Sequence, residues 1–249
     1  MVQSWNPAAV ATLGRIARRP ALLLPHLSLP TLNHLQPATL KAAGVRGVLL
    51  DKDNTITAPY RDEPHPEAQR GLALLLQHFP GRVAILSNSA GTADFDPSGA
   101  EAERLESALG VPVLRHTAKK PMPGADDLAE VLAHFNAQPA AAQPAQLEPQ
   151  SPQAEGRHGR GEAGRGDEGL LRPDELCVVG DRLLTDVLFG NLHGLLTVHL
   201  TATLSLANDN AMARLFRGLE SAVLLPLLKA VGCEAPRHAG WDKAAPPDS

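Results

Sequence analysis

Two aspartates at alternate positions, Asp51 and Asp53, are the residues whose types and spacing most directly predict chemistry in this sequence. They follow an apolar run over 45–50 that is typical of a buried parallel strand. In open α/β sheets, ligands bind where such strands reach their carboxyl ends. One carboxylate can attack phosphorus and carry the phosphoryl group, while the other exchanges protons with the leaving and incoming oxygen atoms. The alternative is a pair of polar residues that only ends a strand.

Two further segments offer groups that would hold a phosphate. Ser87, together with the backbone N–H groups of Asn88 and its neighbours, can bind phosphate oxygen atoms at the N-terminus of a helix. Either Lys119 or Lys120 can neutralise the negative charge that develops as a phosphoryl group is transferred. Taken singly, a serine or a lysine in such a place is usually ordinary surface chemistry.

A later pair of aspartates could serve a cation. Asp181 directly follows an apolar run over 176–180, and Asp186 lies in the segment after it. Mg²⁺ prefers oxygen ligands and is usually held by one or two carboxylates, several waters and the substrate's phosphate. All these polar groups lie at strand ends or just beyond them, in an order that indicates Mg²⁺-dependent phosphoryl transfer.

The elements that must position these residues alternate between strands and helices, which predicts an α/β fold with a parallel sheet covered on both faces. The expected strands cover 45–50, 82–86, 111–115, 176–180 and 194–200. The expected helices cover 67–79, 101–109 and 124–135, with another that ends near 191.

The polar segments resemble the four signatures of the haloacid dehalogenase superfamily of phosphatases. The matching stretches are 51–55, 87–88, 120–121 and 180–186. The resemblance implies a three-layer Rossmann-like fold, with Asp51 as nucleophile and Asp53 as general acid/base. It also implies Mg²⁺ bound by Asp51, the main-chain carbonyl of Asp53 and Asp181, with Asp186 close by in support.

The flanks of these signatures are similar to the mitochondrial phosphatidylglycerophosphate phosphatase family, which forms phosphatidylglycerol on the route to cardiolipin. The similar stretches are 50–54, 86–91, 111–116, 119–121 and 178–183. The resemblance favours Lys120 over Lys119, because the superfamily lysine commonly stands directly before proline. Arg115, His116 and Arg182 are candidate contacts for a glycerophosphate headgroup; the alternative is a purely structural role.

Composition favours one globular domain that is soluble or peripheral to a membrane. The chain has 249 residues, enough for a single full core. Its net charge of -4 argues against general nucleic-acid binding. The 2 cysteines form neither a disulfide framework nor a zinc-binding spacing. No apolar run approaches the roughly 20 residues that a membrane-spanning helix needs, so no transmembrane helix is expected.

The composition also divides the chain into segments. They are a basic segment without acids over 1–40, a phosphatase domain over 41–137 and 170–207, a disordered low-complexity insertion over 138–169, an amphipathic helix over 208–231, and a tail over 232–249. The acid-free start is typical of a transit peptide or of a helix lying on anionic lipid. For the proline-broken stretch over 21–30, packing against the domain and membrane contact weigh equally. For the apolar stripe of the C-terminal helix, core packing is favoured.

The interval between Asp53 and Ser87 holds one helix and its loop, so little or no cap domain is expected over the site. An open site suits a phospholipid substrate at an anionic membrane surface. The resemblance thus implies a mitochondrial enzyme on the matrix side of the inner membrane, acting through an aspartyl-phosphate. A plastid is the alternative location. The alternative functions are a soluble phosphatase for a small monoester or phosphoprotein, and a catalytically silent scaffold.

Overall fold

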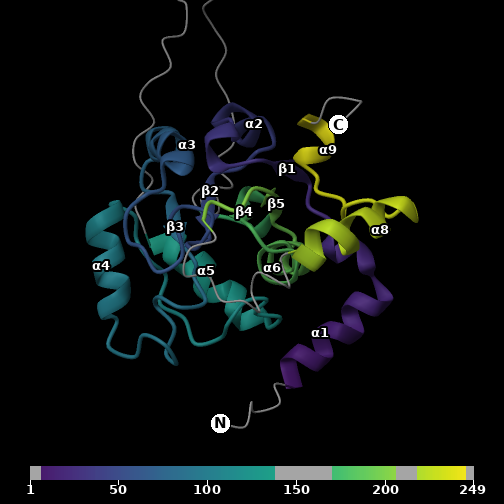
Figure 1. The fold of residues 1–249 in the computed structure, drawn as a ribbon, viewed down its shortest axis with the longest axis horizontal. Coiled ribbons are helices and arrows are strands. Elements are labelled where there is room, and N and C mark those ends of the chain that lie inside the picture. Colours follow the sequence, from purple (N-terminus) through teal and green to yellow (C-terminus); the bar gives the residue numbers. More distant parts are fainter. Residues whose placement is uncertain (1–6, 138–169, 206–217, 245–249) are drawn as a thin grey trace, which may run out of the picture.

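The computed structural model describes residues 7–137, 170–205 and 218–244. Its centre is a five-stranded sheet in the order β1-β5-β4-β2-β3, with every neighbouring pair parallel (Figure 1). The strands are β1 Leu27–Leu29, β2 Gly47–Leu50, β3 Val83–Ile85, β4 Leu176–Gly180 and β5 Leu196–Leu200. The predicted α/β fold with a parallel sheet is confirmed.

The register of the central strands brings their carboxyl ends to one level. Leu50 of β2 is paired with Ile85 of β3 on one side and with Val179 of β4 on the other. Every residue of these three strands is buried, because helices cover both faces of the sheet. The residues that follow the three strands therefore meet at one edge of the sheet.

Helices form a layer on each face of the sheet (Figure 1). One layer packs on a core with Val48, Leu50 and Ile85, and consists of α2 Pro37–Ala42, α3 Pro66–His78 and α4 Ala100–Leu109. The other packs around Leu49 and Val178, and consists of α5 Ala125–Ala137 and α6 Leu188–His193. This is the expected three-layer arrangement. The interval between Asp53 and Ser87 contains only α3 and loops, so no cap domain is inserted there.

The proline-broken stretch near the N-terminus belongs to the folded domain. After α1 Pro7–Arg18 and the 3-10 turn η1 Pro20–Leu23, β1 pairs with β5 as an edge strand. Leu22, Leu23 and Leu24 are buried against Leu225 and Leu228 of the C-terminal helix. Of the two interpretations of this stretch, the structure shows packing against the domain. The expected boundary after residue 40 therefore falls inside the fold.

The C-terminal helix is described from residue 218 onward, and the expected residues 208–217 lie outside the described part. It consists of the π-helical turn η5 Glu220–Leu224 followed by α8 Leu225–Ala230. The core packing expected of its apolar stripe is wrong for Leu219, Val223 and Leu227, which are 52%, 53% and 56% exposed. The helix instead turns Glu220, Leu225 and Leu228 inward, and its π turn breaks the regular period on which the expectation rested.

The remaining elements are short. The expected strand over 111–115 is only an isolated bridge between Val113 and Ile85. The insertion expected over 138–169 lies outside the described residues. Among the residues that the structure describes, no helix is long and apolar enough to cross a bilayer. The other elements are η2 Leu32–His34, η3 Pro173–Glu175, the π turn η4 Leu183–Val187 and α9 Trp241–Ala244.

Candidate active site

A cavity of about 360 Å³ opens at the carboxyl edge of the sheet. Its lining includes Asp51 after β2, Ser87 after β3 and Asp181 after β4. Lys120 reaches it from the loop ahead of α5. The parallel register explains why these residues, far apart in the sequence, share one cavity.

The ammonium of Lys120 lies between two carboxylates. Its Nζ atom donates to Oδ1 of Asp51 at 2.6 Å and also to Oδ1 of Asp186. Burial alone would lower the pKa of Lys120, but the charges and hydrogen bonds of Asp186 and Asp51 outweigh burial, so the pKa is raised. Lys119 instead pairs with Asp94 at 3.7 Å. The structure thus places Lys120, as expected, beside the nucleophile candidate.

Asp51 has an electrostatic environment suited to a reactive carboxylate. Burial raises its pKa to about 6, the charge of Lys120 opposes this rise, and the charges of Asp186 and Asp53 add to it. One oxygen atom of Asp51 is held by Lys120, which fixes the side chain in the cavity. The carboxylate is therefore oriented by one cation and largely shielded from bulk water.

Three carboxylates form a group that fits a hard cation. Ligand oxygen atoms of Asp51, Asp181 and Asp186 all lie within 4.8 Å of one another. Both oxygen atoms of the Asp186 carboxylate accept hydrogen bonds. Oδ1 accepts from Lys120, and Oδ2 accepts from the backbone N–H of Arg182 at 3.3 Å and from Oγ1 of Thr185 at 3.2 Å. An oxygen-only donor set of this kind matches the preference of Mg²⁺. This group contains the two side chains expected to bind the cation, Asp51 and Asp181, with Asp186 beside them.

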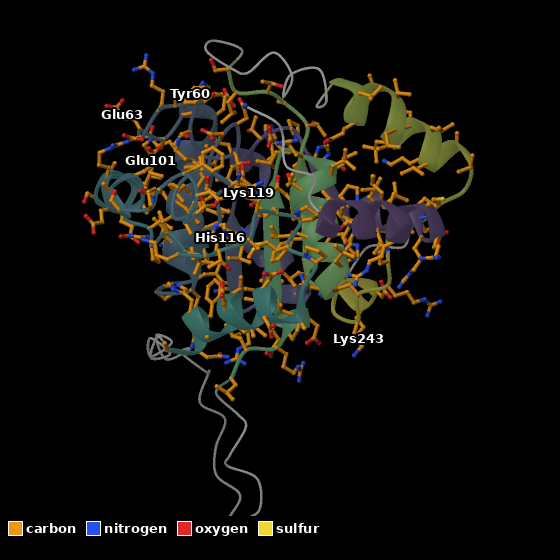
Figure 2. All side chains as sticks on the ribbon, turned by 90° about the horizontal axis from the view of Figure 1, so that it is seen from below. Tyr60, Glu63, Glu101, His116, Lys119 and Lys243 are labelled. Carbon is orange, nitrogen blue, oxygen red and sulfur yellow. The ribbon has the colours of Figure 1, made fainter. Side chains whose placement is uncertain are left out.

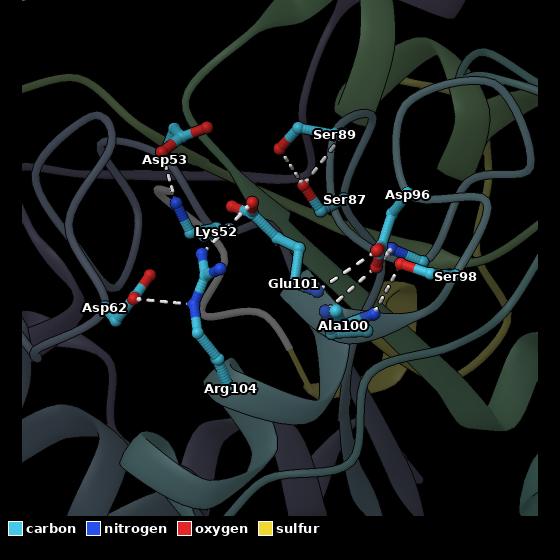
Figure 3. Close-up of polar contacts among 12 residues, drawn as sticks. Lys52, Asp53, Asp62, Ser87, Ser89, Asp96, Ser98, Ala100, Glu101 and Arg104 are labelled. Atoms are coloured by element: carbon cyan, nitrogen blue, oxygen red, sulfur yellow. Dashed lines mark hydrogen bonds and ion pairs between the residues drawn. The ribbon is translucent and has the colours of Figure 1, made fainter.

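Asp53 lines the same cavity, with its side chain 39% exposed. The Nζ atom of the buried Lys52 donates to Oδ1 of Asp53 at 3.1 Å (Figure 3). Sequence reasoning missed Lys52. In a continuing strand, its side chain would point to the face opposite the one that Asp51 and Asp53 share. Strand β2 ends at Leu50, so the alternation of a strand no longer holds. Lys52 thereby fixes the carboxylate expected to move protons.

Ser87 and Asn88 lie in a loop, and the helix N-terminus expected directly after them is wrong. Residues 87–99 contain no helix, and α4 begins only at Ala100. Oγ of Ser87 contacts Oγ of Ser89 at 3.0 Å and accepts from the Ser89 backbone N–H (Figure 3). Oδ1 of Asn88 accepts from the backbone N–H of Lys120 at 2.7 Å. Asn88 thus ties the loop after β3 to the loop that carries Lys120.

The three candidate headgroup contacts lie in different places. Arg115 is outside the cavity lining and pairs with Glu106 at 3.0 Å. The buried ring of His116 contacts the backbone carbonyls of Ser87 and Ala118, so it supports the serine loop from behind. Arg182 does line the cavity, and its buried Nε atom has no hydrogen-bond partner among the residues that the structure describes. Of these three described candidates, Arg182 alone lines the cavity.

A buried acid from the C-terminal helix contacts the turn that carries Asp186, and sequence reasoning missed it. Oε2 of Glu220 accepts from the backbone N–H of Leu183 at 2.7 Å, at the start of the turn that carries Asp186. Burial raises the pKa of Glu220, while its hydrogen bond to Leu183 and the charge of Arg182 lower it. In the sequence, Glu220 looks like an ordinary polar position of an amphipathic helix, and nothing signals its distant partner.

Replacing Glu220 by leucine is expected to lower the free energy of unfolding by about 1–3 kcal/mol, because the buried N–H of Leu183 loses its acceptor. Turnover should also fall severalfold as the turn carrying Asp186 loosens. Thermal unfolding and phosphate release measure the two effects. Glu220→Gln is the matched control, since its amide oxygen can still accept the bond. Wild-type stability in Glu220→Leu would show that the contact does not hold the turn.

The parallel sheet, with two aspartates after β2 and a buried lysine among carboxylates, is the architecture expected of a haloacid dehalogenase-like phosphatase. The family model for mitochondrial PGP phosphatase matches residues 8–148 and 165–205. The chain therefore belongs to the mitochondrial phosphatidylglycerophosphate phosphatase family. No solved structure matches it.

Three curated relatives are similar over most of this chain. Phosphatidylglycerophosphate phosphatase 1, chloroplastic, of Chlamydomonas reinhardtii is 41% identical over 79% of this chain and 60% of its own length. The chloroplastic/mitochondrial protein of Arabidopsis thaliana is 33% identical over 86% and 51%. The mitochondrial phosphatidylglycerophosphatase of Saccharomyces cerevisiae is 32% identical over 72% and 78%. The chain thus spans between half and two thirds of the length of the first two relatives.

Proposed function

We propose that this protein is a Mg²⁺-dependent phosphatase that hydrolyses phosphatidylglycerophosphate to phosphatidylglycerol through an aspartyl-phosphate. The observation that carries the proposal is the buried Lys120 ammonium between Asp51 and Asp186, with Asp181 and Asp53 in the same cavity. The names of the relatives support the substrate.

In the first step, a carboxylate oxygen of Asp51 forms a bond to phosphorus. The bond between phosphorus and the glycerol oxygen breaks, and Asp53 gives its proton to that oxygen as the alcohol leaves. Lys52 holds Asp53 at 3.1 Å, so the acid is oriented before the substrate arrives. Lys120 stabilises the negative charge on the transferring group and directs one oxygen of Asp51.

In the second step, Asp53 accepts a proton from a water molecule, and the water oxygen bonds to phosphorus. The bond between phosphorus and Asp51 breaks, which regenerates the carboxylate and releases inorganic phosphate. Ser87 and the backbone of its loop bind phosphate oxygen atoms during both steps. Asp51, the main-chain carbonyl of Asp53 and Asp181 would hold Mg²⁺. The bound ion would neutralise the negative charge of the phosphate oxygen atoms.

The location follows from the substrate and from the relatives. Relatives of this chain are named as mitochondrial, chloroplastic or both, so the proposed location is a mitochondrial or plastid membrane surface. In mitochondria, the matrix side of the inner membrane is the proposed place. Arg15 and Arg18 in the last turn of α1 and the exposed apolar residues Leu219, Val223 and Leu227 support contact with anionic lipid.

The decisive test is phosphate release in the presence of Mg²⁺, with phosphatidylglycerophosphate compared with soluble phosphate monoesters. We expect the lipid to be the better substrate by at least about tenfold in kcat/KM, a difference of about 1.4 kcal/mol in transition-state binding. Removal of divalent metal by a chelator should lower turnover by about 10²-fold, because it removes several kcal/mol of charge stabilisation.

Two controls make the test specific. Added Mg²⁺ should restore the chelated enzyme, and Asp51→Asn protein measures the background release. Equal or faster turnover of the soluble monoesters would favour the soluble phosphatase instead. Full activity in excess chelator would contradict the role of the metal.

A further inference from the structure

Two aromatic side chains at the mouth of the cavity are exposed to solvent. Tyr60 is 73% exposed and Phe95 is 63% exposed, and both line the cavity that contains Asp51. They come from separate loops, one between β2 and α3 and the other between β3 and α4. Large aromatic side chains usually bury much of their surface. Two of them at one cavity mouth form an apolar rim, and contact with a ligand or another surface would bury it.

The backbone of Tyr60 and a contact of Phe95 show that specific local interactions hold the two aromatic residues of the rim. The backbone of Tyr60 has φ of 60°, a left-handed conformation that is unusual for a bulky residue. A residue other than glycine adopts that conformation at a cost in conformational energy. The ammonium of Lys119 lies 3.7 Å from the centroid of the Phe95 ring, a cation–π contact that fixes the second aromatic. Figure 2 labels Tyr60 and Lys119, both in the upper half of the view.

We infer that the aromatic rim formed by Tyr60 and Phe95 inserts into the interfacial layer of a phospholipid bilayer and sets the cavity mouth at the depth of lipid headgroups. The inference rests on the proposed function, because a lipid phosphate remains attached to acyl chains that stay in the bilayer. A cavity of about 360 Å³ has room for a headgroup only. Its mouth must therefore meet the membrane surface, where aromatic side chains are favoured.

The rim is surrounded by both positive and negative side chains. Its contact with a bilayer therefore does not depend on attraction to anionic lipid. Arg61 and Lys119 lie beside the aromatics, but so do Asp62 and Asp94. The rim therefore gains its affinity from burial of aromatic surface, which salt does not screen. The basic residues of the N-terminal helix can attract anionic lipid independently. Binding through the rim should accordingly persist at high salt and on zwitterionic lipid.

Vesicle flotation of the full chain tests the inference without turnover. With phosphatidylcholine vesicles at high salt, Tyr60→Ser and Phe95→Ser should each lower the partition coefficient by roughly tenfold, as expected for losing part of a buried aromatic surface. Leu170→Ser is the matched control, because Leu170 is 54% exposed but precedes the amino end of β4. It should bind vesicles as the wild type does. Equal binding by the wild type and both rim variants would overturn the inference.

A fluorescence measurement locates the rim directly. Phe95→Trp keeps an aromatic side chain and should be quenched by brominated phosphatidylcholine more strongly than the wild type, which supplies the background from Trp5 and Trp241. Leu170→Trp should show no added quenching. No added quenching at position 95, or an oligomer formed through the rim in place of vesicle binding, would also overturn the inference. Activity towards phosphatidylglycerophosphate is measured separately, so failure of the proposed function is distinguishable from failure of the rim.

Discussion

Asp51→Asn protein is expected to lose phosphate release by about 10⁴-fold or more while it keeps its fold. The amide has nearly the shape of the carboxylate but cannot form the bond to phosphorus, and loss of a nucleophile removes most of the rate acceleration of a covalent mechanism. Burial already raises the pKa of Asp51 to about 6, so a neutral side chain at this position relieves a desolvation cost. Thermal unfolding should therefore occur near the wild-type temperature, as scanning calorimetry would show.

Asp53→Asn is the matched comparison, because it removes the other carboxylate of the same loop. Its rate should fall by about 10²-fold, since proton transfer by a positioned group contributes 10²–10⁴-fold. Loss of water activation should also make the phosphorylated Asp51 accumulate, which mass spectrometry of the quenched enzyme detects. Wild-type turnover in Asp51→Asn would refute the nucleophile assignment. A folded wild type without turnover on any phosphate ester would favour the silent scaffold.

Much of the fold can be predicted from the sequence because the central strands are buried on both faces. β2 and β4 are apolar runs followed by polar residues, β5 has leucine or valine at every second position, and the structure has all three close to the expected bounds. β1 could not be predicted, because it has only three residues between Pro25 and Pro30 and exists through its pairing with β5. Three residues are too few for a periodic signal, and the pairing is a long-range contact.

The residues of the candidate site also fall into those that the sequence predicts and those that it does not. Asp51, Ser87 and Asp181 come together because parallel strands end at one edge, a consequence of topology that polar strand ends reveal. Glu220 and Tyr60 have no such signal. The first depends on a contact between the C-terminal helix and Leu183, and the second on the conformation of one loop. Local patterns carry no information on contacts of these two kinds, so only the structure assigns these residues to the site.

Replacing Lys120 by methionine is expected to lower turnover by about 10³-fold and the free energy of unfolding by about 3–5 kcal/mol. The Lys120 side chain is 2% exposed and bonds to both Asp51 and Asp186. Methionine has a similar length, so the variant removes the charge with little change in volume. The carboxylates are then left buried and uncompensated. Phosphate release with Mg²⁺ and chemical denaturation in chelator measure the two effects.

The pH dependence of that loss separates charge compensation from packing. Without Lys120, the pKa of Asp51 should rise further above its unfolded value, because Lys120 is the group that lowers it. An acid with a raised folded-state pKa binds its proton more tightly in the folded state, so its stabilising contribution is present at low pH and is lost as pH rises through that pKa. The stability difference from the wild type should therefore grow as the pH rises above about 6, the pKa of Asp51 in the wild type. Lys243→Met, at an exposed lysine of α9, should show no difference at any pH. A constant difference for Lys120→Met as the pH rises would mean that Lys120 serves packing, and the electrostatic basis of the proposed mechanism would fail with it.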